Sequence, residues 1–94
     1  MTKNELIREV HVTLRDYHLR DVSYAVNSIF EAMKMALKKN ERIEIRGFGN
    51  FTVRNRKPRR GRNPKTGTTV QIPPRKVAFF KVGKELKGMV EAQG

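Results

Sequence analysis

The sequence contains no cysteine, so disulfides, thiolate nucleophiles and thiolate metal sites are excluded. No apolar run approaches the roughly 20 residues that span a bilayer, and no apolar segment typical of a secretion signal opens the chain. The 94 residues are enough for one small domain. We therefore expect a single domain, residues 1–94, that is cytoplasmic and makes no contact with membranes.

Candidate catalytic groups are equally sparse. The two histidines, His11 and His18, have no third ligand or nucleophile at a recognisable spacing. The carboxylates are scattered among basic residues, as is typical of exposed helix surfaces. We therefore expect no catalytic residue, no metal ion, no cofactor and no small-molecule substrate, and we do not expect an enzyme.

Acidic residues are also missing from a long central stretch. The forty positions from Ile45 to Lys84 hold twelve Lys or Arg residues and no Asp or Glu, and the whole chain carries a formal charge of +12. A protein that needs charge only for solubility would intersperse the two signs. Concentrated positive charge attracts a polyphosphate backbone. The pattern favours a basic nucleic-acid-binding arm, and a solvated, disordered segment is the plainer alternative.

Residues 1–40 predict two helices. Thr2 and Glu5 have the spacing of a capping box at the start of the first helix. From Val22 to Leu37 the apolar residues recur at helical spacing, and Asn40 is placed to end the second helix in the left-handed conformation. The apolar face of this long second helix must be buried against a partner surface.

Residues 41–82 change to the period of strands. Strict alternation over Arg42–Arg46 predicts a half-buried strand, Gly47–Asn50 a turn, and Phe51 the start of a second strand. Residues 83–94 then predict a short C-terminal helix. The chain is therefore expected to be an α+β domain with a three-stranded antiparallel sheet.

A long hairpin arm is expected over about residues 54–75. No face of its outgoing half is apolar, and Asn63–Gly67 carries turn chemistry at its tip. Pro58, Pro73 and Pro74 are tolerated there because each strand of a two-stranded ribbon has a free edge.

Four phenylalanines, at positions 48, 51, 79 and 80, lie near the base of this hairpin. Exposed aromatic rings could act as stacking platforms for single-stranded nucleic acid. Their positions beside the expected apolar strands instead favour packing in a core or in a dimer. Only 37% of the residues are apolar, and small chains with a thin core often gain stability by oligomerising.

Two motifs connect the chain to a known family. Gly47-Phe48-Gly49-Asn50-Phe51, followed by Gly61-Arg62-Asn63-Pro64-Lys65-Thr66-Gly67, resembles the bacterial HU/integration host factor proteins over essentially the whole length. Within that family, the segment from Asn40 to Gly49 and the opening Met1-Thr2-Lys3 look most like the integration host factor beta branch.

The resemblance implies an intertwined dimer whose two arms enter the minor groove of duplex DNA, where a proline at each tip kinks it. By position, Pro64 is the intercalating residue, and Glu44 would orient Arg46. The dimer core would contain Phe30, Phe48, Phe51 and Phe80. The implied DNA contacts are Arg46, Arg54, Arg56, Lys57, Arg59, Arg60, Arg62, Asn63, Pro64, Lys65, Thr66, Arg75, Lys76, Lys81 and Lys84.

The function expected from the resemblance is that of an architectural protein of the bacterial nucleoid that binds and bends duplex DNA. A small RNA-binding or ribosomal structural protein is the alternative, because it would also be basic and bear an arm. The sequence leaves open whether the partner subunit is identical or a related alpha-type chain. It also leaves open whether binding is sequence-specific.

Overall fold

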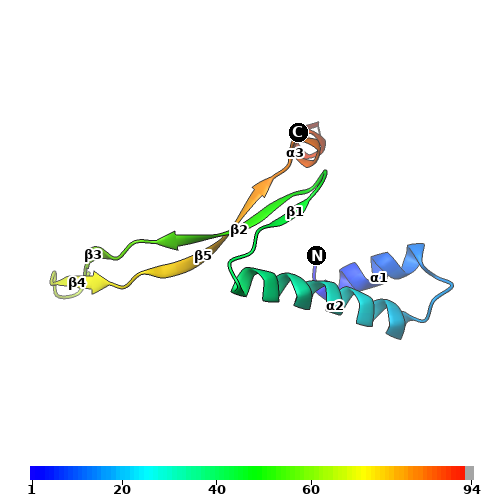
Figure 1. Cartoon of the computed structure of the whole chain (residues 1–94), viewed down its shortest axis with the longest axis horizontal. Coiled ribbons are helices and arrows are strands. Elements are labelled where there is room, and N and C mark those ends of the chain that lie inside the picture. Colours follow the sequence, from blue (N-terminus) through cyan, green and yellow to red (C-terminus); the bar gives the residue numbers. More distant parts are fainter. Residues whose placement is uncertain (93–94) are drawn as a thin grey trace. The chain divides into compact units, whose positions relative to one another are not determined.

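The computed structural model describes residues 1–92, which form two compact units that divide between Met35 and Ala36. Figure 1 labels the helices and strands. They are α1 (Lys3–Thr13), α2 (Leu19–Lys38), β1 (Ile43–Ile45), β2 (Gly49–Arg56), β3 (Arg59–Arg62), β4 (Thr69–Ile72), β5 (Arg75–Val82) and α3 (Lys84–Ala92). The expected α+β class and order of elements are confirmed.

The first unit is a helix pair with a small core. Ile7 from α1 packs with Val22 and Val26 from α2, and Val10 and Phe30 lie against this cluster. The Thr2 hydroxyl accepts a hydrogen bond from the backbone N–H of Glu5 at 3.2 Å, which is the N-cap half of the expected capping box. Among residues 1–92, Ile7, Val22 and Val26 are the only buried large apolar side chains.

Helix α2 ends as its sequence predicts. Asn40 has a φ of 65°, in the left-handed region. Its N–H donates to Leu37 O at 3.0 Å, and the N–H of Glu41 donates to Ala36 O at 2.9 Å. This pair of bonds is the Schellman motif, and it satisfies carbonyls that the end of the helix would otherwise leave unpaired.

The second unit is built on an antiparallel sheet in the order β1-β2-β5. Ile43 pairs with Phe51, and Phe51 pairs with Phe80, so the three form one apolar row across the sheet. Phe80 also covers Gly49, where an added Cβ would lie 2.5 Å from the Lys81 carbonyl oxygen and 2.6 Å from the Phe80 ring. Position 49 therefore requires glycine.

The first turn of the sheet differs slightly from the prediction. β1 is limited to Ile43–Ile45, and β2 already begins at Gly49, so the turn is tighter than Gly47–Asn50. The N–H of Phe48 donates to Ile45 O at 3.0 Å, and Gly47 has a φ of 82°. A four-residue turn with glycine at its third position explains the difference, because glycine adopts positive φ without strain.

Helix α3 follows the sheet directly. The N–H of Gly83 donates to Phe48 O at 2.8 Å, which fixes the start of the helix beside the first turn. Of the C-terminal helix expected over 83–94, residues 84–92 are helical, while 93 and 94 lie outside the described residues. Within residues 1–92, no helix is long and apolar enough to cross a membrane.

Candidate nucleic-acid interface

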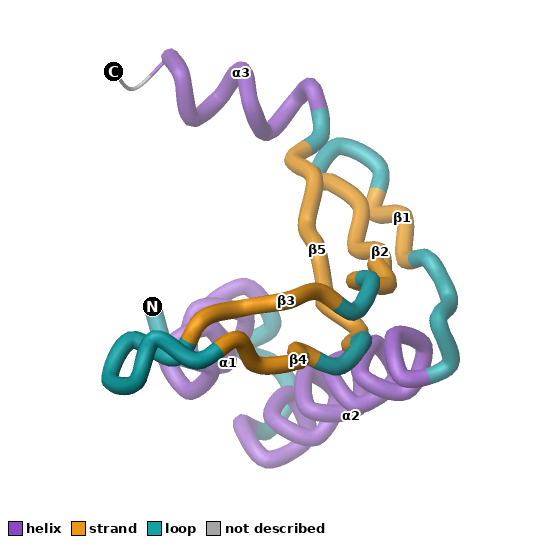
Figure 2. Tube along the Cα trace, turned by 90° about the vertical axis from the view of Figure 1, so that its left-hand side faces the viewer, coloured by secondary structure: helices purple, strands orange, loops and turns teal. Residues whose placement is uncertain are grey.

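The cationic segment forms one continuous ribbon that extends beyond the three-stranded sheet (Figures 1 and 2). The β2–β5 ladder ends at the pair Arg56 and Arg75, and the β3–β4 ladder begins at the pair Arg59 and Ile72. Each strand advances by three residues between these pairs, so the register does not slip. The predicted hairpin arm is therefore present.

The interruption between the ladders contains the three prolines predicted to lie in the ribbon. Pro58 follows Lys57 on the outgoing side, and Pro73 and Pro74 separate β4 from β5. Proline has no N–H to donate to a ladder, which accounts for the break. An open groove lies there, lined by Arg56, Lys57, Pro58, Arg59, Ile72, Pro73, Arg75 and Val77.

The tip of the ribbon is an ordered turn. The N–H of Asn63 donates to Thr68 O at 2.8 Å, and the N–H of Gly67 donates to Asn63 O at 2.7 Å. The Asn63 side-chain oxygen accepts from the N–H of Lys65 at 2.9 Å. Gly67, with a φ of 70°, supplies the left-handed position. Pro64 is exposed at the apex of this turn.

The arm also contains an apolar contact that sequence reasoning missed. An added Cβ on Gly61 would lie 2.8 Å from Ile72 Cδ1 and 3.8 Å from Val70 Cγ2, so these side chains lie across the glycine. Gly61 pairs directly with Val70 in the ladder. The sequence signal for this contact is a glycine, Gly61, on one strand opposite the β-branched Val70 on the other, because a residue without a side chain leaves room for its neighbours across the ladder.

The predicted contact residues are almost all available to a partner. Asn63 is half-buried, and the other fourteen, including all twelve cations from position 46 to position 84, are exposed. Among residues 1–92, the two ion pairs are Lys34 with Glu31 and Arg42 with Glu44. None of the predicted contact residues takes part in either pair, so their charges are not neutralised within this part of the chain.

The expected orientation of Arg46 by Glu44 is wrong for this structure. Glu44 Oε1 lies 3.1 Å from Arg42 Nε instead. With its amide oriented to satisfy both neighbours, Asn50 also accepts from Arg42 Nη2 at 3.2 Å. β1 ends at Ile45, so Arg46 has already entered the turn and no longer continues the alternation that would have placed it beside Glu44.

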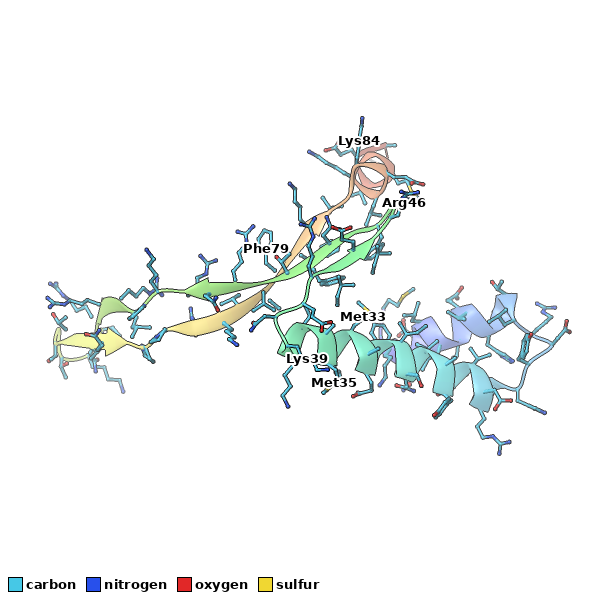
Figure 3. The ribbon with its side chains drawn as sticks, viewed as in Figure 1. Met33, Met35, Lys39, Arg46, Phe79 and Lys84 are labelled. Carbon is cyan, nitrogen blue, oxygen red and sulfur yellow. The ribbon has the colours of Figure 1, made fainter. Side chains whose placement is uncertain are left out.

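Arg46 and Lys84 mark the end of the sheet farthest from the arm tip (Figure 3). The turn that carries Arg46 lies against the first turn of α3, since a Cβ on Gly47 would lie 2.8 Å from a Glu85 carboxylate oxygen. The cations thus extend from this end of the sheet to the tip of the ribbon.

The sheet has two chemically different faces. Phe51 and Phe80 have ring centroids 4.7 Å apart, and Phe48 and Phe80 have centroids 5.5 Å apart, which places an aromatic cluster on one face. Phe48 remains 45% exposed and Phe80 38% exposed. Phe79 departs from the expected core role, because it lies on the opposite face with the Arg54 guanidinium 3.7 Å above its ring.

Within residues 1–92, no three His, Cys, Asp or Glu side chains are grouped closely enough to hold a metal ion. The structure instead presents many hydrogen-bond donors, the guanidinium and ammonium groups along a narrow ribbon that ends in an ordered turn. Such a set is suited to phosphate oxygens, which accept hydrogen bonds and carry negative charge. Fold and surface together define a basic protein with a β-ribbon arm.

Comparison with known proteins agrees with this class. The sequence profile of the family described as "Bacterial DNA-binding protein" matches residues 1–91. The integration host factor beta subunit of Pseudoalteromonas atlantica is 50% identical over 90 residues, covering 96% of this chain and 94% of the relative. That of Bordetella petrii is 47% identical over 94 residues, covering 100% and 79%.

Solved structures of HU proteins are similar to this chain over nearly its whole length. The HU protein of Anabaena, in a cocrystal with DNA, superposes with a TM-score of 0.85 at 31% identity, covering 96% of this chain and 97% of the other. A mutant HU from Thermotoga maritima gives 0.67 at 34% identity, covering 96% and 99%. The chain belongs to the HU/integration host factor family of bacterial DNA-binding proteins.

Proposed function

We propose that this chain is an architectural protein of the bacterial nucleoid that grips duplex DNA as a dimer and bends it with its two arms. One observation carries the proposal. Twelve exposed cations, with no acidic residue between them in sequence, extend from the far end of the sheet along a register-continuous ribbon to a hydrogen-bonded tip with an exposed proline. The cocrystal of the related HU protein with DNA supports the choice of ligand.

Affinity in this mechanism comes mainly from phosphates. Each Lys or Arg that neutralises a phosphate releases condensed counterions, so binding is strong at low salt and falls steeply as salt rises. Such contacts position the protein on the duplex but do not read its sequence. Selectivity between sites then depends on groove width and on how easily a given sequence deforms.

Bending is assigned to the tip. A ribbon is narrow enough to lie in the minor groove, and the exposed ring of Pro64 is placed to wedge between two base pairs. Unstacking a step costs a few kcal/mol, which the bend offsets by bringing flanking DNA onto other cations. Asn63, Lys65 and Thr66 would meet the groove beside the wedge, and Arg59, Arg60 and Arg62 would line it along the ribbon.

A dimer is proposed because one chain leaves its apolar surface uncovered. Buried large apolar side chains among residues 1–92 are limited to Ile7, Val22 and Val26, while Ile29 is 60% exposed and Tyr24 76%. Half-buried Phe30 and the aromatic cluster on the sheet add to this surface. A second subunit, either an identical chain or a related alpha-type chain, would bury it.

The wedge is tested with a duplex labelled at both ends for fluorescence energy transfer. Pro64→Ala should lower the transfer at saturating protein, because alanine cannot hold the base step apart. Pro58→Ala is the matched control, since Pro58 lies at the ladder interruption and not at the tip. A Pro64→Ala protein that bends the duplex as sharply as the parent rules out the wedge.

The RNA-binding alternative is tested by competition. A nicked or four-way DNA should displace the protein from a labelled DNA duplex at lower concentration than double-stranded RNA of equal length. A-form RNA lacks the narrow minor groove that the ribbon is proposed to enter. Stronger competition by the RNA would reverse the assignment.

The identity of the partner is tested by sedimentation of the purified chain alone. A mass of two chains at micromolar concentration supports a homodimer. A mass of one chain that doubles only on addition of an alpha-type subunit supports the heterodimer, and a mass of one chain under both conditions contradicts dimerisation.

A further inference from the structure

Phe79 lies in an unusual place for a large apolar side chain. The ladder pairs Thr52 with Phe79 and Arg54 with Val77, so Arg54 and Phe79 are diagonal neighbours on one face of the sheet. The Arg54 guanidinium carbon lies 3.7 Å from the centroid of the ring. Figure 3 marks Phe79 on this ladder.

Core packing does not account for the ring. The aromatic cluster of Phe48, Phe51 and Phe80 is on the opposite face, and Phe79 remains 36% exposed. By strand alternation, the other residues of its face are polar or cationic, including Lys81 and Arg56, apart from the half-buried Val77. We therefore look for the role of this exposed ring in its contact with the Arg54 guanidinium.

The geometry sets the direction of Arg54. On one side along the ladder, Arg54 has the like charges of the Arg56 and Arg75 pair, and on the other side it has Phe79. The guanidinium lies over the ring, because the negative π face attracts a cation whereas the neighbouring arginines repel it. The contact thus favours one side-chain conformation of Arg54 before any ligand arrives.

A stacked guanidinium keeps its binding capacity. Its five N–H donors lie in the plane of the group, so contact of one flat face with a ring leaves all of them free for phosphate oxygens. An arginine that is already ordered loses less side-chain entropy when it binds. We propose that Phe79 is a positioning residue that holds Arg54 as a preformed phosphate clamp at the base of the arm, an inference that rests on the proposed function.

The test is a double-mutant cycle on binding of the full chain to a random-sequence duplex at fixed salt. Phe79→Leu keeps apolar bulk but removes the π face of the ring. Each subunit that carries this substitution should raise the dissociation constant for the duplex roughly three-fold. Phe79→Tyr keeps the ring and should bind as the parent does. In an Arg54→Gln background, Phe79→Leu should have no further effect, since the charge it positions is gone.

A second readout uses the free protein. The Arg54 Nε–H resonance should be displaced by the ring current of Phe79, and this displacement should vanish in Phe79→Leu and persist in Phe79→Tyr. It reports the pair without DNA. A melting temperature of Phe79→Leu equal to that of the parent separates positioning from a structural role.

Three results overturn the inference: equal effects of Phe79→Leu in both backgrounds, no effect on binding in either, or a parent spectrum without the ring-current displacement. A parent protein that binds no duplex overturns the proposed function and the clamp together. A parent that binds duplex with additive effects overturns the clamp alone, so the two failures are distinguishable.

Discussion

The side-chain oxygen of Asn63 accepts a hydrogen bond from the backbone N–H of Lys65 at 2.9 Å, and this bond spans Pro64. The backbone of Asn63 is also held, through its bonds with Thr68 and Gly67. Asn63 is half-buried, whereas its neighbours in the turn are exposed. The residue before the proposed wedge therefore also braces the turn, in addition to the groove contact proposed for it.

Loss of this brace should weaken bending. Asn63→Ala removes the acceptor for the Lys65 N–H, at a cost of about 1 kcal/mol to the ordered turn. We expect roughly five-fold weaker duplex binding and lower energy transfer at saturation in the end-labelled duplex assay. Asn63→Asp keeps a side-chain acceptor for the same bond and should restore the bend, with affinity reduced by its negative charge. An Asp variant that bends as poorly as the Ala variant would show that the amide itself meets DNA.

The end of α2 allows a stability prediction. Asn40 has a φ of 65°, and residues with a Cβ and no compensating side-chain bond adopt this conformation at a cost of about 1–2 kcal/mol. Asn40→Ala should lower the unfolding free energy by about 1 kcal/mol in urea titrations, whereas Asn40→Gly should not. Lys39→Ala, one residue earlier, is the control and should be neutral. Equal losses for Ala and Gly at position 40 would contradict the argument.

Elements with a strong local signal were predictable. The capping oxygen of Thr2, the left-handed Asn40 and the turn at Asn63–Gly67 depend on residues close in sequence, and each is present in the structure. The long α2 stripe and the hairpin alternation have clear periods, so the order of the elements was also predictable.

Features that depend on the register between strands were not predictable from the sequence. Alternation alone puts Phe79 and Phe80 on opposite faces of their strand, but which of the two rings joins Phe51 follows only from the pairing of β2 with β5. The same holds for the Ile72 contact with Gly61, which needs the β3–β4 register. The Glu44 contact was missed because spacing by two allows either Arg42 or Arg46, and the early end of β1 decides between them.

The aromatic cluster should link folding to assembly. Phe80 contacts both Phe48 and Phe51 and covers Gly49, so Phe80→Ala removes these contacts and should cost about 2 kcal/mol, less than at a fully buried site because the ring is 38% exposed in one chain. If a second subunit covers the cluster, the dimer should also dissociate at higher protein concentration. Urea unfolding at two protein concentrations measures both effects. Val70→Ala removes a 41% exposed apolar residue from the arm and should cost well under that amount.

Salt dependence should separate the interface cations from the others. The logarithm of the binding constant falls linearly with the logarithm of salt concentration, with a slope of about 0.9 for each phosphate neutralised. Lys81→Ala, on the cationic face of the sheet, should therefore reduce the slope by about that amount per protomer. Lys34→Ala removes the same charge from α2, where Lys34 Nζ lies 2.9 Å from Glu31 Oε1, and should leave the slope unchanged. Titrations of a fluorescent duplex at four salt concentrations measure the slopes. Equal reductions of the slope for the two variants would mean that the overall charge of the protein, and not the position of the cations on the sheet and arm, determines binding.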